Sequence, residues 1–263
     1  MIHDFLELPT FVMCSIAMLL STTISVTALI IIRRKLNWET FRDNHQVGGF
    51  LFNALGLIYA VLIAFVVFAT WGDYNSAKEY CDREANMMQD LFLNSEALPE
   101  NIRTPIKEKI LEYLTKVIKE DWPLLSVDKS NPSSRHTLLE LWRIYMGINS
   151  FENEKQKIVF EETITRLNNV TDFRRMRILS SQNHIPAVIW TVIIIGALTS
   201  VGFSLFFGTK SLAVQATMTS LFAMTDSVIL LLILALDHPF TGDIKITSLQ
   251  FENIFSALKN IAY

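Results

Sequence analysis

The sequence has few cysteines and no excess of basic charge. Its 263 residues include only two cysteines, Cys14 and Cys81, and neither belongs to a CxxC motif or a Cys/His cluster. We therefore expect neither a disulfide nor a structural zinc site. Lysine and arginine number 23 against 26 acidic residues, so the charge gives no support for binding to nucleic acid.

Catalytic signatures are also missing. The sequence contains no GxSxG, HExxH, P-loop or GxGxxG motif, each of which would place reactive groups in a defined local geometry. Its five histidines are too far apart for a local metal motif: His3, His45, His136, His184 and His238. We expect no catalytic residue, metal or cofactor, and a membrane enzyme is the third-ranked hypothesis.

Charge is nearly absent from four long apolar runs. They are Phe11–Ile32, Gly48–Trp71, Ile185–Phe207 and Leu212–Leu236, and together they contain a single charged residue, Asp226. About 20 apolar residues in a helix cross the hydrocarbon core of a bilayer, so each run predicts a transmembrane helix. The first ten residues contain no Lys or Arg, so the first run is expected to be a retained span and not a cleaved signal peptide.

The spacing of the runs predicts an all-α integral membrane protein built from two helical hairpins. Short loops join spans 1 and 2 and spans 3 and 4, which puts the termini and the long middle segment on one side of the membrane. The expected parts are an N-terminal tail (1–10), a first hairpin (11–71), a helical soluble domain (72–184), a second hairpin (185–236) and a C-terminal tail (237–263).

The distribution of positive charge bears on the orientation. Arg33, Arg34 and Lys35 directly follow span 1, which favours the short loops inside and the termini outside. Arginines before span 3, on the opposite side, nearly balance that count. We expect the plasma (inner) membrane of a bacterium, with the termini and the soluble domain outside.

Helical periodicity continues through the middle segment. Apolar residues from Tyr74 to Phe92 recur at three- and four-residue steps, so span 2 is expected to continue as one helix that ends before Pro99. Thr104-Pro105 predicts the start of the next helix and Trp122-Pro123 its end. Further helices are expected around residues 138–145, around 158–179 and, in the tail, at Ile254, Phe255 and Leu258.

The polar residues inside the spans are the main candidates for function. A charge in mid-bilayer is costly, and Asp226 shares one face of span 4 with Gln215 and Thr219. That face is expected to meet protein or water, either as the lining of an ion path or as a buried, hydrogen-bonded Asp. Asn53 adds a polar group on span 2.

Small residues mark close approach between helices. Span 2 carries Gly49, Gly56, Ala60 and Ala64 near one face, and span 3 carries Gly196 and Ser200. Such stripes allow tight packing within a subunit or between subunits. We expect a packed bundle and a homo-oligomer, surrounded by membrane lipids.

Span 4 ends in a distinctive segment, which consists of Asp237, His238, Pro239, Phe240, Thr241 and Gly242. Pro239 stops the helix, which favours a structural terminus, and a gate that responds to protonation is the alternative. Arg174, Arg175 and Arg177 are candidates to pair with Asp237 or to contact lipid phosphates at the interface.

A series of short motifs resembles a known family. In order along the chain they are Asn44 with VGGF at 47–50, YAVL at 59–62, FVV at 65–67 with Trp71, LPE at 98–100, DWP at 121–123, LW at 141–142, Arg174, Arg175 and Arg177, Pro186, Trp190, Gln215 with Met218-Thr219, and LDxPFxG at 236–242. Over about residues 10–258 the chain is similar to the bestrophin-like domain family, a widespread bacterial membrane family of unknown function.

The resemblance implies four membrane helices around a helical middle domain. Bestrophins are pentameric anion channels in which the second helix lines the pore and the middle domain and termini are cytoplasmic. No gate or filter residue can be matched to this sequence.

Our leading hypothesis is an oligomeric ion channel or pore, a pentamer if it is truly bestrophin-like, with spans 2 and 4 nearest the path. The bestrophin resemblance favours anions, and an ionised Asp226 in the path would favour cations or protons. A non-conducting sensor or scaffold, whose helical domain binds a partner, is the alternative.

Overall fold

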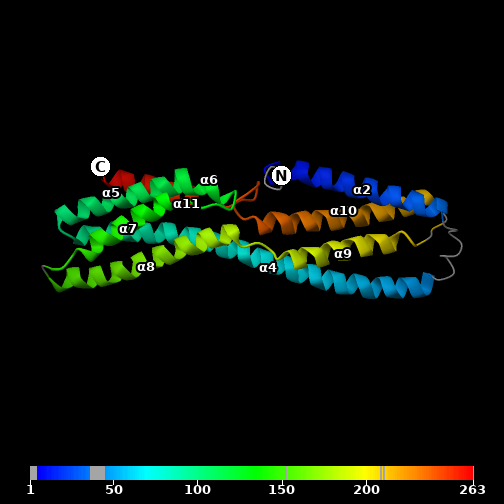
Figure 1. Cartoon of the computed structure of the whole chain (residues 1–263), viewed down its shortest axis with the longest axis horizontal. Helices are drawn as coiled ribbons and strands as arrows, with labels where there is room; N and C mark the ends of the chain where they lie inside the picture. Colours follow the sequence, from blue (N-terminus) through cyan, green and yellow to red (C-terminus); the bar gives the residue numbers. More distant parts are fainter. Residues whose placement is uncertain (1–4, 36–44, 152, 208, 210, 263) are drawn as a thin grey trace. The chain divides into compact units, whose positions relative to one another are not determined.

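The computed structural model describes residues 5–35, 45–151, 153–207, 209 and 211–262, and the described chain is helical without a strand. This confirms the predicted all-α class. The helices are α2 (Thr10–Lys35), α4 (His45–Asn94), η1 (Ser95–Ala97), α5 (Glu100–Lys116), the π-helical η2 (Val117–Asp121), α6 (Trp122–Leu125), α7 (Pro132–Met146), α8 (Glu154–Gln182), α9 (Ala187–Ser204), α10 (Leu212–Asp237) and α11 (Leu249–Ala262) (Figure 1).

The chain divides into two compact units. Unit 1 comprises Met1–Gly72 and Ile185–Asp237, and unit 2 comprises Asp73–His184 and His238–Tyr263. The helices α2, α4, α9 and α10 are each long and apolar enough to cross a membrane, in agreement with the four predicted spans. As the apolar periodicity indicated, α4 continues without interruption past the end of span 2 to Asn94, as one helix of 50 residues.

In unit 1, α2 packs along α10 (Figure 1). The Ser21 hydroxyl donates to Ser227 across this contact at 3.2 Å. At the end of α2, Arg33 donates to the backbone carbonyl of Thr209 at 2.6 Å and to the side-chain oxygen of Gln215 at 3.4 Å. Arg33, which the sequence analysis counted only as a topology signal, therefore also fastens α2 to the start of α10.

The contact between α4 and α9 is close. A Cβ atom added at Gly196 would lie only 2.4 Å from the Tyr59 ring, so the ring occupies the space that a side chain at 196 would need. Beside it, Ile63, Ile193 and Ile233 form a buried apolar cluster from α4, α9 and α10. These contacts hold three of the spanning helices together.

Unit 2 has the larger apolar core. The α4 residues Ala77, Cys81, Ala85, Met88 and Phe92 are buried, as their spacing predicted. An apolar stripe along α5 and the start of η2 is also fully buried: Ile106, Ile110, Tyr113, Leu114 and Val117. Phe251, Ile254 and Leu258 of α11 join this core, so the C-terminal tail is an amphipathic helix packed within unit 2.

Two expected helix boundaries were wrong, and proline explains both. The helix α5 begins at Glu100, because Pro99 adopts an extended conformation and its carbonyl accepts from Ile102 and Arg103. Pro105 thus lies inside the helix and not at its start. The helical path also does not end at Trp122-Pro123 but continues to Leu125, since proline is tolerated in the first turn of α6.

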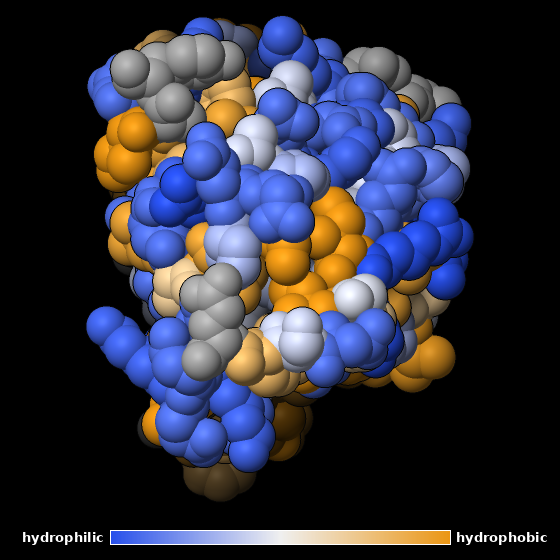
Figure 2. Space-filling model, turned by 90° about the vertical axis from the view of Figure 1, so that its left-hand side faces the viewer, coloured by the Kyte–Doolittle hydropathy of each residue, from blue (hydrophilic) through white to orange (hydrophobic). Residues whose placement is uncertain are grey.

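The surface of unit 2 suits contact with water. In Figure 2, the face at the left-hand side of Figure 1 is mostly hydrophilic, with smaller hydrophobic areas between the polar side chains. The apolar side chains on the spanning helices of unit 1, by contrast, are largely exposed, including Phe11, Phe65, Phe68, Val188 and Leu198. Such side chains require lipid or another membrane helix as their surroundings.

Candidate functional site

A partly polar cavity lies among α4, α9 and α10 of unit 1. It has a volume of about 440 Å³. Its lining includes four polar residues, Asn53, Tyr59, Ser200 and Asp226, together with apolar residues that include Phe52, Ile63, Phe222 and Ile229. Among the described residues that line it, none is basic. The cavity therefore brings together two of the predicted polar residues, Asn53 and Asp226, and three predicted packing residues, Gly56, Ala60 and Ser200.

Two polar groups in this cavity are buried without a hydrogen-bond partner in the described chain. Asp226 is 8% exposed, and its Oδ2 atom accepts no hydrogen bond. Ser200 is fully buried, and its Oγ atom is also unpartnered. Buried polar groups normally have partners because desolvation is costly, and this cavity has two residues with such unpartnered atoms in one lining.

The other two candidate residues on α10, Gln215 and Thr219, lie outside this cavity. Gln215 and Thr219 are buried, and the Gln215 amide donates to the carbonyl of Leu205 while its oxygen accepts from Arg33. Neither residue lines the cavity. The polar face of span 4 thus meets protein, as predicted, but only its Asp226 end reaches the cavity.

The small residues separate into two groups. On α9, Gly196 lies in close contact with Tyr59. On α4, a Cβ atom at Gly49 or Gly56 would meet no described atom within 4 Å, and Ala60 and Ala64 are exposed. The small face of α4 therefore does not pack tightly within the subunit.

The end of span 4 is held by backbone contacts. The buried carboxylate of Asp237 accepts a hydrogen bond from the backbone N–H of Ile185 at 2.7 Å within unit 1. In unit 2, Phe240 joins the core and Gly242 has a φ of 86°, a conformation that favours glycine. Pro239 is buried, and its carbonyl accepts from Ile246. His238 stacks on His184 with ring centroids 4.5 Å apart.

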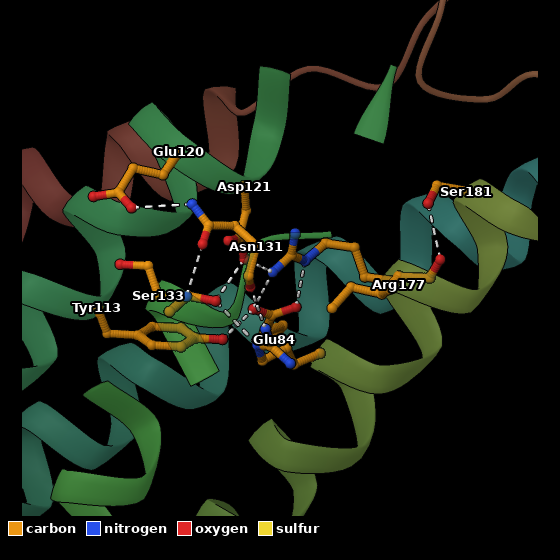
Figure 3. Close-up of polar contacts among 11 residues, drawn as sticks. Glu84, Tyr113, Glu120, Asp121, Asn131, Ser133, Arg177 and Ser181 are labelled. Carbon is orange, nitrogen blue, oxygen red and sulfur yellow. Dashed lines mark hydrogen bonds and ion pairs between the residues drawn. The ribbon is translucent and has the colours of Figure 1, made fainter. Parts of the chain in front are cut away.

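Unit 2 contains a buried ion network (Figure 3). Arg177 of α8 donates to Glu84 of α4 at 2.7 and 3.1 Å and to Asp121 of η2 at 3.2 Å. Tyr113 of α5 donates to Glu84 at 2.6 Å, and Ser134 of α7 donates to Asp121 at 2.6 Å. One network thus joins five elements of the unit.

Aromatic rings complete the surroundings of Arg177. Its guanidinium carbon lies 5.5 Å from the ring centroid of Trp122 and 5.7 Å from that of Phe251, which are cation–π distances. Burial alone would lower the pKa of Arg177, but the neighbouring carboxylates outweigh it and raise the pKa above its ordinary value. Burial and the Glu84 charge likewise raise the pKa of Tyr113 well above 10, so its hydroxyl keeps the proton that it donates.

The three arginines proposed as lipid contacts therefore differ. Arg177 is fully buried, so it does not reach a lipid phosphate, and its expected role was wrong because two carboxylates hold it inside the unit. Arg174 is half-buried and donates to Ser134 and to the carbonyl of Asn131. Arg175 is exposed and lies 3.6 Å from Asp172.

Comparison with known proteins decides the family. The family model for the bestrophin-like domain matches residues 19–251. The chain belongs to the bestrophin-like family. No match was found among curated proteins.

Solved structures of a bacterial bestrophin homolog from Klebsiella pneumoniae share the fold of this bestrophin-like chain. A point mutant of that homolog matches with a TM-score of 0.72 and 13% identity over 95% of this chain and 98% of that one. A structure phased with zinc matches with a TM-score of 0.69 and 13% identity over 94% and 97%. The chain is thus an integral membrane protein with a bestrophin-type fold.

Sequence reasoning missed the network that Glu84, Tyr113 and Asp121 form with Arg177, although Arg177 itself carried a signal. It continues the buried spacing of Thr163, Leu167 and Val170 along α8. Charged residues at core positions of a helical stripe require a partner of opposite charge, and that rule could have paired Arg177 with a buried carboxylate in this bestrophin-like protein.

We predict that Arg177→Met lowers the free energy of unfolding by about 3–5 kcal/mol, because it leaves two buried carboxylates without their counter-charge. Chemical unfolding of the detergent-solubilised protein, followed by its tryptophan fluorescence, to which the adjacent Trp122 contributes, measures this. The matched control is Arg175→Met on the exposed side of α8, for which we expect a change within about 0.5 kcal/mol. Equal stability of the two variants would contradict a structural role for the network.

Proposed function

We propose that this protein is an oligomeric membrane ion channel or pore in which α4 lines the path. The observation that carries the proposal is the outward face of α4 in unit 1. Asn53, Leu57, Ala60 and Ala64 are exposed there, so beside Leu57 this face of a spanning helix presents one polar side chain and two small residues to its surroundings. Small and polar side chains leave room for ions, and they are poorly suited to contact with lipid.

The cavity supports the same proposal. Because Asn53, Leu57 and Ala60 are both exposed and part of its lining, the cavity opens at the outward face of α4. Asp226 is thereby connected to the proposed path. Gln215 and Thr219 are buried elsewhere, so we assign the lining to α4 and the Asp226 end of α10 alone.

The resemblance to bestrophins supports the number of subunits and the position of the pore. Their second helix lines a pore at the centre of a pentamer, and α4 is the second spanning helix here. We extend both features to this chain as proposals, and we place the protein in the inner membrane of a bacterium. The resemblance favours anions whereas Asp226 favours cations, so the channel proposal itself does not depend on the type of ion.

We predict that the purified protein gives ohmic unitary currents in planar bilayers and that Ala60→Phe strongly reduces them. The benzyl group would narrow the path at the face of α4. The control is Val188→Phe on α9, where Val188 is 73% exposed and does not line the cavity; it should conduct as the wild type does. An intact oligomer that passes no current in any salt would exclude a channel and favour the sensor or scaffold.

We further propose that the termini and unit 2 lie outside the cell, on the basis of the positive charges that follow span 1. Bestrophins have the opposite orientation, so a direct measurement is needed. Cys81 cannot serve as a reporter, because it is 2% exposed and burial raises the pKa of its thiol well above the ordinary value. Ser150, which lies between α7 and α8, is exposed.

We predict that Ser150→Cys, made in a Cys14→Ala background, reacts with a membrane-impermeant maleimide in intact cells. The same background without the new cysteine should stay unlabelled, since Cys81 is buried. Labelling of Ser150→Cys only after the cells are lysed would reverse the proposed orientation and agree with the bestrophin arrangement.

A further inference from the structure

The cavity among α4, α9 and α10 contains an acidic group without a counter-charge. Asp226 is 8% exposed, and no basic residue is among the described residues that line its surroundings. An isolated carboxylate in the low-dielectric part of a membrane is costly. This contrasts with Glu84 and Asp121 in unit 2, which share the charge of Arg177. Asp226 therefore has to be neutralised by something other than a side chain.

Each polar residue that lines the cavity has an oxygen atom in its side chain. Asp226, Ser200, Asn53 and Tyr59 all belong to the lining, and the Oδ2 atom of Asp226 and the Oγ atom of Ser200 are buried without a hydrogen-bond partner among the described residues. Carboxylate, carbonyl, hydroxyl and water oxygens are the ligands that hard cations prefer. The remaining lining is apolar, which would strengthen the attraction between a cation and the carboxylate.

Charge balance selects the valence of the cation. One monovalent cation on one carboxylate gives a neutral site, whereas a divalent cation would leave a net positive charge in the membrane. The volume of about 440 Å³ far exceeds the roughly 30 Å³ that a water molecule occupies in the liquid. An alkali cation could therefore enter with part of its hydration shell.

We propose that Asp226, Ser200 and Asn53 form a binding site for a monovalent alkali cation inside each subunit. Its role in transport rests on the proposed function, because the cavity opens at the face of α4 assigned to the path. Binding itself is independent of conduction. Asp226 and Tyr59 are the titratable residues among the described lining, so protons would compete with the alkali cation at Asp226.

The test is thermal unfolding of the purified full-length protein in lipid nanodiscs at pH 8, with Na⁺ replacing N-methyl-D-glucamine at constant ionic strength. We predict a saturable rise in Tm for the wild type, since a ligand that binds only the folded state stabilises it. In Asp226→Asn the rise should be absent, and in Ser200→Ala it should need about tenfold more Na⁺. The control is Thr225→Val, because Thr225 is exposed beside Asp226 and bonds only to the carbonyl of Leu221.

Three results would overturn the proposal. An unchanged Na⁺ response in Asp226→Asn would place the effect elsewhere. A wild-type Tm that depends on pH but not on Na⁺ would show that a proton neutralises Asp226. Equal stabilisation by Mg²⁺ at the same concentration would contradict the selection of a monovalent ion.

If Asp226→Asn does not yield a folded oligomer, sodium NMR line broadening of the wild type and Ser200→Ala replaces it, with K⁺ as competitor. Broadening that K⁺ reverses and that weakens in Ser200→Ala supports the site, and its absence refutes it. Na⁺ binding without unitary currents would overturn the channel and leave the site intact.

Discussion

Charged groups that folding removes from water need a counter-charge, and the two units meet this requirement in different ways. In unit 2, Arg177 is surrounded by Glu84 and Asp121, with Trp122 and Phe251 near its guanidinium. This network joins α4, α5, η2, α7 and α8, so the helices of the unit depend on it for their relative positions. In unit 1, Asp226 has no such partner among the described residues that line its cavity. The same constraint that makes one site structural makes the other a candidate for binding an ion.

The two sites also differ in what surrounds them. The network in unit 2 is closed, since Arg177 and Glu84 are fully buried. Replacement of Arg177 or Glu84 by an uncharged residue would leave the charge of the other buried without its counter-charge. The cavity at Asp226 is lined in part by exposed residues of α4, and the proposed ion site depends on entry from that face. Both sites contain buried charge. The candidate ion site at Asp226 differs from the structural network around Arg177 in lying beside exposed residues.

Much of the fold was predictable because the membrane imposes a simple rule on sequence. Four nearly uncharged runs of sufficient length predicted α2, α4, α9 and α10, and helical periodicity predicted the core of unit 2. Proline signals misled at Pro105 and Pro123, since a helix accepts proline near its start and the competing N-terminus at Pro99 was available. Asp226 was identified from its cost in a bilayer, but Ser200 was predicted only as a packing residue. Ser200 and Asp226 share a cavity because of the way α9 and α10 pack together. The spacing of residues along a single helix does not reveal that packing.

If the proposed cation site at Asp226 lies on the proposed ion path along α4, it should make that path selective for cations. The most direct test is the reversal potential across a bilayer with a tenfold NaCl gradient, measured for the wild type and for Asp226→Asn. The account predicts that the wild type reverses close to the equilibrium potential of Na⁺ and that Asp226→Asn moves the reversal toward zero. A wild type that reverses near the Cl⁻ potential, with no change in Asp226→Asn, would contradict it.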